Sequence, residues 1–124
     1  MDDALTTLLD RLARFGDEND SRETERPKRM LNITRDTGRL LWIIVCATRA
    51  TRILEVGTSN AFSTIWLADA AHATGGRVTT LEVNADKIAL ARANLASAGL
   101  DGVVEIIARR ETGELLESFA GLRL

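Results

Sequence analysis

The sequence has little of what marks secreted, membrane-spanning or nucleic-acid-binding proteins. Its single cysteine, Cys46, lies in an apolar helical pattern and cannot form an internal disulfide. No stretch approaches the roughly 18 apolar residues of a membrane span, and the N-terminus lacks the basic start of a signal peptide. The net charge of −2 gives no general attraction to nucleic acid or anionic membranes. We therefore expect a reduced, cytoplasmic protein that binds neither nucleic acid nor membrane.

Proline is equally scarce. The only one, Pro27, lies in the polar stretch 17–29, which we predict to be a loop or a solvated helix. A basic cluster begins there and is interpreted as a solvated surface rather than a patch for an acidic substrate: Arg26, Lys28, Arg29 and Arg35.

Hydrophobic periodicity predicts strands that alternate with helices, and hence an α/β fold with a parallel sheet. The 124 residues suffice for one domain but are few for a complete doubly wound sheet. The predicted helices are 3–15, 35–49, 63–73, 85–98 and 114–119, and the predicted strands are 53–56, 77–83 and 103–107. Gly16 is expected to end the first helix, while Thr34 and Asn84 are expected to cap the second and fourth.

Side chains outside the strands have simpler interpretations. The apolar positions of the second helix are expected to pack against the sheet: Leu40, Leu41, Ile43, Ile44 and Ala47. Trp42 is expected in the core or a subunit contact, and His72 in solvent.

The stretch Arg52 to Ser63 predicts a strand, a tight turn at Gly57 and a helix. In open α/β sheets, ligands bind beyond the carboxyl ends of the strands. Glycine at this turn permits an unusual φ and lets a ligand approach the backbone. Glu55 would place a carboxylate in the same crevice, where it would repel a phosphate but accept a cationic or hydroxyl-bearing ligand.

Glu82 ends the second predicted strand, 25 positions after Gly57. An acidic side chain at this spacing can accept hydrogen bonds from both hydroxyls of a ribose. By itself Glu82 is better explained as a solvated residue before a helix; together with Glu55 and Gly57 it indicates an adenosine site. The glycines of a dinucleotide fingerprint are missing after Gly57, which disfavours NAD and FAD. S-adenosylmethionine carries a ribose and a cationic sulfonium without phosphate, and therefore suits both carboxylates.

Two segments carry a family resemblance, Ile53 to Thr64 and Val78 to Val83. They resemble the class I S-adenosylmethionine-dependent methyltransferases, and more closely the bacterial O-methyltransferases related to the catechol and caffeoyl-coenzyme A enzymes. Arg29 to Thr34, followed by Thr37 and Gly38, resembles the part of that branch that helps to cover the cofactor. The resemblance spans about residues 26–107.

The resemblance implies a Rossmann-like α/β fold and a set of cofactor-binding residues. Glu55 and Gly57 match the cofactor-loop motif, and Thr58, Ser59 and Ser63 would contact the methionine tail. Glu82 would bind the ribose and Val83 would lie beside the adenine, while Ile33 and Thr34 match the covering segment. Ala61 stands where the family often has glycine. After the third strand the family commonly has Gly-Asp-Ala, and here Ala108, Arg109 and Arg110 precede Glu111, the candidate substitute for that Asp.

The resemblance also implies a division of the chain and a function. Residues 1–33 would form an N-terminal helix and covering segment, and residues 34–124 a partial Rossmann-like domain truncated to about three strands. The leading hypothesis is the cofactor-binding half of an S-adenosylmethionine-dependent O-methyltransferase that acts on a small-molecule hydroxyl. A non-catalytic adenosine-binding or interaction fragment is the alternative, and a nucleotide-dependent oxidoreductase comes third.

In the metal-dependent members of the family, the metal ligands and the catalytic base come from the fourth strand onward, so neither a catalytic nor a metal-binding residue is named. In the family's strand order the first strand lies between strands two and four, and a chain with three strands leaves one edge of it unpaired. We expect that such a fragment either self-associates through this edge or its N-terminal helices, or covers the edge with those helices.

Overall fold

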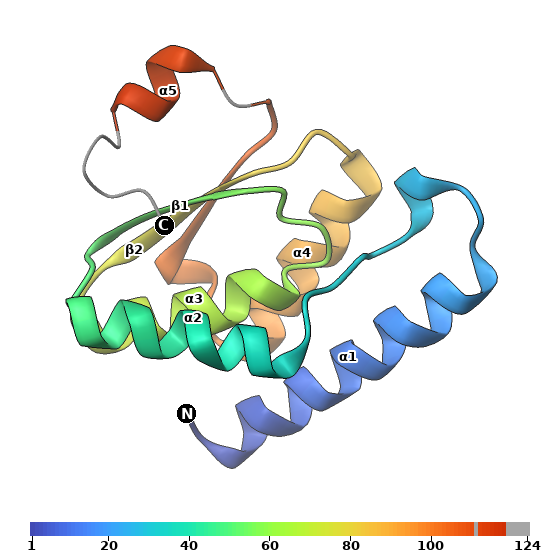
Figure 1. Cartoon of the computed structure of the whole chain (residues 1–124), viewed down its shortest axis with the longest axis horizontal. Helices are drawn as coiled ribbons and strands as arrows, with labels where there is room; N and C mark the ends of the chain where they lie inside the picture. Colours follow the sequence, from blue (N-terminus) through green and yellow to red (C-terminus); the bar gives the residue numbers. More distant parts are fainter. Residues whose placement is uncertain (111, 119–124) are drawn as a thin grey trace.

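The computed structural model describes residues 1–110 and 112–118 of the chain. Helices α1 (Asp3–Arg22) and α2 (Arg35–Thr48) precede strand β1 (Arg52–Val56), and helix α3 (Phe62–Thr74) leads to β2 (Arg77–Leu81). Helix α4 (Ala85–Ala98), β3 (Val104–Ile107) and the short α5 (Gly113–Glu117) follow (Figure 1). Short 3-10 turns occupy Arg26–Lys28 and Asp101–Val103.

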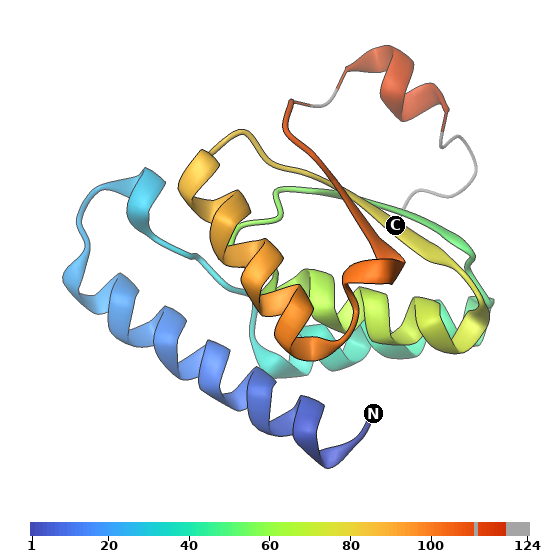
Figure 2. The same cartoon turned by 180° about the vertical axis from the view of Figure 1, so that it is seen from behind.

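The three strands form a parallel sheet in the order β1-β2-β3. Ile53 lies opposite Val78, which lies opposite Val104, so one row of aliphatic side chains crosses all three strands. Helices α1 to α4 lie on one side of the sheet, while α5 lies apart from them (Figures 1 and 2). The predicted α/β fold with a parallel sheet is confirmed.

The hydrophobic core lies between this row and the helices. Helix α3 is at its centre, because Ile65, Ala68 and Ala71 have no exposed surface. Helix α1 adds a stripe of leucines spaced three and four residues apart: Leu5, Leu8, Leu9 and Leu12. Trp42 lies partly buried between α2 and α3, where its indole Nε1 donates to Asp69 Oδ2 at 2.9 Å.

Two predicted boundaries are wrong. Helix α1 continues past Gly16 to Arg22. Gly16 is buried, and a Cβ at this position would lie only 2.4 Å from Nδ2 of Asn32. This glycine thus permits a close approach rather than ending a helix. Strand β2 ends at Leu81, so Glu82 and Val83 follow the strand instead of ending it.

The prediction for α2 is also partly wrong. Leu40 and Ile43 are 55% and 49% exposed, and Ala47 is exposed as well. The helix packs against α3 instead, and its buried residues are Gly38 and Val45. Gly38 is required there, since a Cβ would lie 2.3 Å from Nε1 of Trp66.

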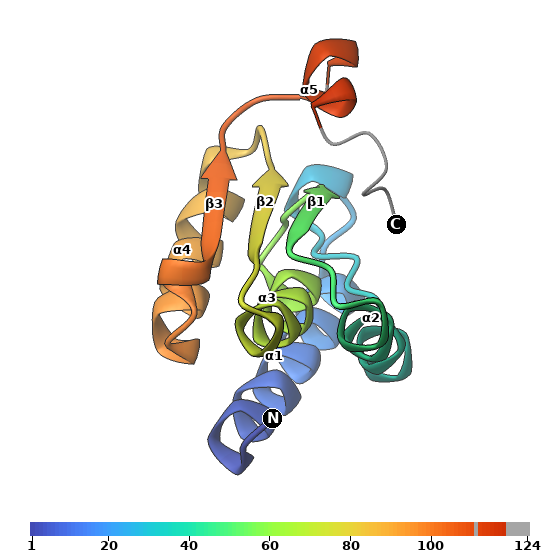
Figure 3. The ribbon, with the colours of Figure 1, turned by 90° about the vertical axis from the view of Figure 1, so that its left-hand side faces the viewer.

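Strand β1 is at the edge of the sheet, and its outer side has no partner strand among the described residues (Figure 3). Val56 at its end is 53% exposed. Helix α1 packs against α3, on the side of the sheet that the helices cover (Figure 1). In the described part of the chain, no helix combines the length and the apolar character needed to cross a membrane.

Candidate functional site

The loop after β1 has the shape that the sequence predicted. Gly57 adopts φ +91°, in the region that favours glycine. The N–H groups of Gly57 and Thr58 both donate to the carbonyl of Leu81, at 2.8 and 3.1 Å, and so tie the loop to the end of β2. A Cβ built on Gly57 would meet no atom within 4 Å. The space beside this bend is therefore open, as a ligand that approaches the backbone would require.

Glu55 points toward the start of α3. Its Oε2 accepts a hydrogen bond from Ser63 Oγ at 2.6 Å, and its Oε1 accepts from Thr80 Oγ1 at 2.8 Å and from Thr64 Oγ1. Burial raises the pKa of Glu55 above its ordinary value of 4.5, and the nearby Glu82 carboxylate raises it further, while the hydroxyl bonds act in the opposite direction. A cation would relieve this cost of a buried negative charge.

Glu82 is tied to the loop by backbone donors. Its Oε1 accepts from the N–H of Ser59 at 2.8 Å, and its Oε2 accepts from the N–H groups of Val83 and Asn84, each at 3.1 Å. A carboxylate offers about four acceptor positions, so Glu82 keeps capacity for a further donor. The two carboxylates of Glu55 and Glu82 thus flank one loop, between β1 and α3.

Thr58 is placed differently from the other loop residues. It is 1% exposed, its hydroxyl pairs with that of Thr80 at 2.7 Å, and its N–H is taken by Leu81. Thr58 therefore shapes the loop, since its hydroxyl and its N–H both have partners within the protein. Its expected contact with a ligand stays a prediction. Thr80 was missed by the sequence reasoning, although the register that sets it opposite Glu55 would have revealed it.

The loop enters α3 through two residues with positive φ, Ser59 at 50° and Ala61 at 73°. Ala61 precedes the helix in a left-handed conformation and has no exposed surface. This conformation explains why a glycine suits the position, and it shows that alanine is nevertheless accommodated.

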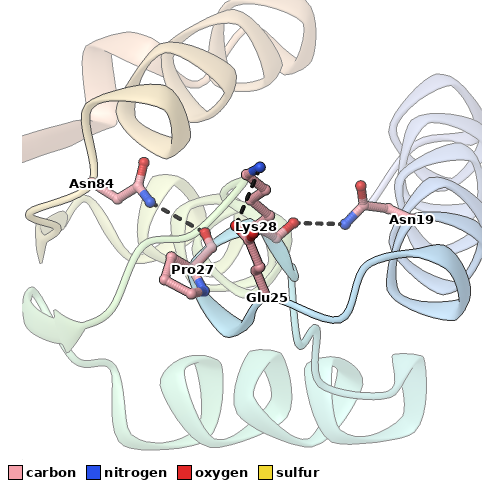
Figure 4. A network of polar contacts seen from close by, with 5 residues as sticks. All are labelled: Asn19, Glu25, Pro27, Lys28 and Asn84. Carbon is pink, nitrogen blue, oxygen red and sulfur yellow. Dashed lines mark hydrogen bonds and ion pairs between the residues drawn. The ribbon is translucent and has the colours of Figure 1, made fainter.

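A covering segment, defined here as residues 23–34, lies beside this loop. Ser59 Oγ donates to the carbonyl of Met30 at 2.9 Å, and Asn84 Nδ2 donates to the carbonyl of Pro27 at 3.2 Å. Figure 4 shows that Asn19 of α1 also reaches this segment, because its Nδ2 donates to the carbonyl of Lys28 at 2.9 Å. The segment therefore bridges α1, the loop and the start of α4.

Asp20 of α1 binds the covering segment at Met30 and Leu31. Its two carboxylate oxygens accept from the consecutive N–H groups of Met30 and Leu31, at 2.7 and 2.8 Å. Burial is the largest single influence on Asp20 and opposes its ionisation. These two bonds, a hydrogen bond from Asn19 and the nearby Arg29 charge together hold the pKa of Asp20 below its ordinary value. Leu31 adopts φ 51° at this point. No sequence motif marked Asp20, since its partners lie ten and eleven positions away.

The remaining predicted site residues are more scattered. Ile33 packs against the core, and Thr34 caps α2 by accepting from the N–H of Thr37 at 3.1 Å. The hydrogen bond from the covering segment to the loop is made by Met30 and not by these two. Val83 follows Glu82 with 55% of its side chain exposed. Glu111 lies outside the described residues.

A groove of about 360 Å³ lies between the covering segment, the end of α1 and the start of α4. Met30 and Asn84 line it, so it adjoins the loop residues without including Gly57 or Glu82. Within residues 1–110 and 112–118, no cluster of three or more acidic, histidine or cysteine side chains could hold a metal ion.

Comparison with known proteins identifies the family of this chain. A family model described as O-methyltransferase matches residues 9–120. A catechol O-methyltransferase of Mycobacterium tuberculosis is 41% identical over 75 residues, which make up 60% of this chain and 34% of that protein. This chain therefore spans about a third of the length of that curated relative.

Solved structures agree with this match. The cofactor-bound protein Rv0187 of Mycobacterium tuberculosis has a TM-score of 0.66 and 34% identity, and the match covers 98% of this chain and 50% of that one. The O-methyltransferase TomG of Streptomyces achromogenes, solved in complex with SAM, has a TM-score of 0.66 and 29% identity over 97% of this chain and 48% of its own. Since the family model matches most of its length, the chain belongs to the O-methyltransferase family.

Proposed function

We propose that this chain is the S-adenosylmethionine-binding part of an O-methyltransferase that acts on the hydroxyl group of a small molecule. The observation that carries the proposal is the pair of carboxylates, Glu55 and Glu82, beside the open bend at Gly57. Family membership and the structure of TomG in complex with SAM support it from outside the chain.

The residues of the loop fit this cofactor in three ways. The space beside Gly57 leaves the backbone accessible. Glu55 carries a negative charge whose burial a cationic sulfonium and ammonium group would offset. Glu82 has about one acceptor position left for a ribose hydroxyl after its three backbone bonds. Exposed Val83 would then lie beside the adenine.

When bound, the cofactor supplies a methyl group on a positively charged sulfur, ready for in-line transfer to an oxygen nucleophile. The residues of this chain would hold the adenosine and the amino-acid tail in a fixed position, with Ser63 and Thr64 orienting Glu55. Ser59 would complete the loop by linking Glu82 to the covering segment. We assign no catalytic base in this chain.

A second candidate is a non-catalytic adenosine-binding or interaction module. The chain spans 34% of a curated relative and about half of a solved chain, and this candidate needs only the binding loop that those residues contain. This candidate and the methyltransferase share the same binding loop, so they differ only in methyl transfer.

Calorimetry with S-adenosylmethionine and S-adenosylhomocysteine tests the binding site. We expect measurable binding that Glu82→Gln weakens by about tenfold, because each lost charge-assisted hydrogen bond costs about 1.5 kcal/mol. Glu105→Gln, an exposed carboxyl on β3, is the matched control and should bind as the parent chain does. Equal affinity in both variants would refute the role of Glu82. A methyl-transfer assay with catechols then separates the two candidates.

Three further expectations from the sequence stay proposals. The open edge of β1 supports self-association through that edge, and exposed Leu40 and Ile43 offer a second apolar surface on the N-terminal helices. The lone Cys46 supports a reduced, cytoplasmic setting, which cell fractionation would test. The division at residues 33 and 34 is supported by the helix cap at Thr34, although the leucines of α1 share the main core.

A further inference from the structure

Asp20 is connected to the proposed cofactor site through a continuous set of hydrogen bonds. Its carboxylate accepts from Met30 and Leu31, the carbonyl of Met30 accepts from Ser59 Oγ, and the N–H of Ser59 donates to Glu82. Each bond is between 2.7 and 2.9 Å long. A side chain on the N-terminal helix is therefore coupled to the carboxylate that we assign to the ribose.

The geometry at Asp20 restrains the covering segment strongly. Two consecutive N–H groups bound by one carboxylate fix the orientation of the peptide plane between Met30 and Leu31, and Leu31 is held at φ 51°. An L-residue in this conformation is disfavoured by about 1–2 kcal/mol, so the turn needs such an external restraint. The restraint also directs the carbonyl of Met30 toward Ser59.

We propose that Asp20 is a positioning residue of the cofactor site, which holds Met30 against Ser59 and thereby sets the loop for binding of the adenosine. The proposal rests on the proposed function, and it goes beyond it in assigning a role to a residue of α1. Asp20 does not touch the cofactor; it acts through Met30 and Ser59.

The competing explanation is that Asp20 only fastens the covering segment to α1. In that case the loss of its charge would free the N–H groups of Met30 and Leu31 and lower stability, but would leave Ser59 and the cofactor affinity unchanged. The two explanations differ at Ser59, which lies on a different element and 29 positions from Met30.

The experiment compares Asp20→Asn with Asp17→Asn, a control at an exposed position of the same helix. Amide hydrogen exchange of the ligand-free protein is measured first, and calorimetry with S-adenosylmethionine follows. We expect Asp20→Asn to speed exchange at Leu31 at least tenfold and at Ser59 about threefold, and to weaken binding about five- to tenfold. Asp17→Asn should change none of these values.

A double-mutant cycle with Ser59→Ala tests the route. Because Ser59→Ala already removes the bond to Met30, the effect of Asp20→Asn on affinity should fall by at least half in that background. An unreduced effect would overturn the proposal, and so would an unchanged exchange rate at Ser59 in Asp20→Asn. If Asp20→Asn does not fold, Asp20→Glu is measured instead, because it keeps the charge on a longer side chain and should give smaller changes in the same direction. An unchanged exchange rate at Ser59 in Asp20→Glu would overturn the proposal.

The outcomes also separate this proposal from the proposed function. If the parent chain binds no S-adenosylmethionine, the proposed function fails, and the exchange rate at Ser59 still decides whether Asp20 positions the loop. If the parent chain binds and Asp20→Asn binds equally well, the proposed function stands and the role of Asp20 is refuted.

Discussion

Gly57→Ala tests whether the open space beside the loop is the cofactor site, because its effect on affinity can be compared with its effect on stability. The glycine has φ +91°, and an added Cβ would touch no atom within 4 Å in the ligand-free protein. The substitution therefore adds no clash to the folded chain. It adds backbone strain, and it puts a methyl group into the volume that we assign to the cofactor.

The expected cost in stability is small and can be matched elsewhere. A left-handed conformation costs an L-residue about 1–2 kcal/mol, while alanine gains about 0.4–1 kcal/mol by restricting the unfolded chain. The net loss is about 1 kcal/mol, or roughly 3–6 °C in Tm for a chain of this size. Gly75 and Gly99 have φ +78° and +69° and open space around the missing Cβ, so their alanine variants should lose the same amount.

Binding should distinguish the three variants. A methyl group forced into a packed contact costs about 1–3 kcal/mol, which corresponds to an affinity loss of roughly 5- to 150-fold for Gly57→Ala. Gly75→Ala and Gly99→Ala should bind S-adenosylmethionine like the parent chain. Thermal unfolding gives the matched stability and calorimetry gives the affinity. If Gly57→Ala binds as tightly as Gly99→Ala, the cofactor does not pass over this bend and the assigned site is wrong.

Three further predictions follow from the buried groups and the open edge. The raised pKa of Glu55 means that the folded state holds its proton more tightly than the unfolded state, so stability should fall as pH rises from 4.5 through the folded-state value. Glu55→Gln should flatten that part of the curve of unfolding free energy against pH, and an unchanged slope would contradict the assignment. Leu9→Ala should cost about 2–5 kcal/mol in chemical denaturation, because Leu9 is 1% exposed in the shared core, and a cost under 1 kcal/mol would mean that α1 is not part of that core. Light scattering should find the parent chain self-associated and Val56→Lys shifted toward the monomer, since a charge protects an exposed strand edge; a monomeric parent chain would refute pairing through β1.

Local sequence determined the features that depend on residues a few positions apart. The β-branched and aliphatic runs specified the three strands, and the turn at Gly57 followed from the end of one run and the start of a helical pattern. Thr34 and Asn84 were identified as caps because a cap needs only a side-chain acceptor and the N–H groups of the next turn. The placement of Glu55 near the end of β1 and of Glu82 just after β2, at the same edge of the sheet, followed from the parallel order of the strands.

Only the tertiary structure decided which donors each carboxylate meets. Thr80 reaches Glu55 across a separation of 25 residues, and its partner depends on the register of β1 with β2. The covering segment contacts the loop through Met30, whose N–H is held by Asp20 and whose carbonyl accepts from Ser59. The packing of α1 sets the distance between Asp20 and Met30. Gly16 was misjudged for the same reason, since only the approach of Asn32 requires a glycine there. Contacts of this kind depend on how helices and strands pack, and the periodicity of a single segment carries no information about them.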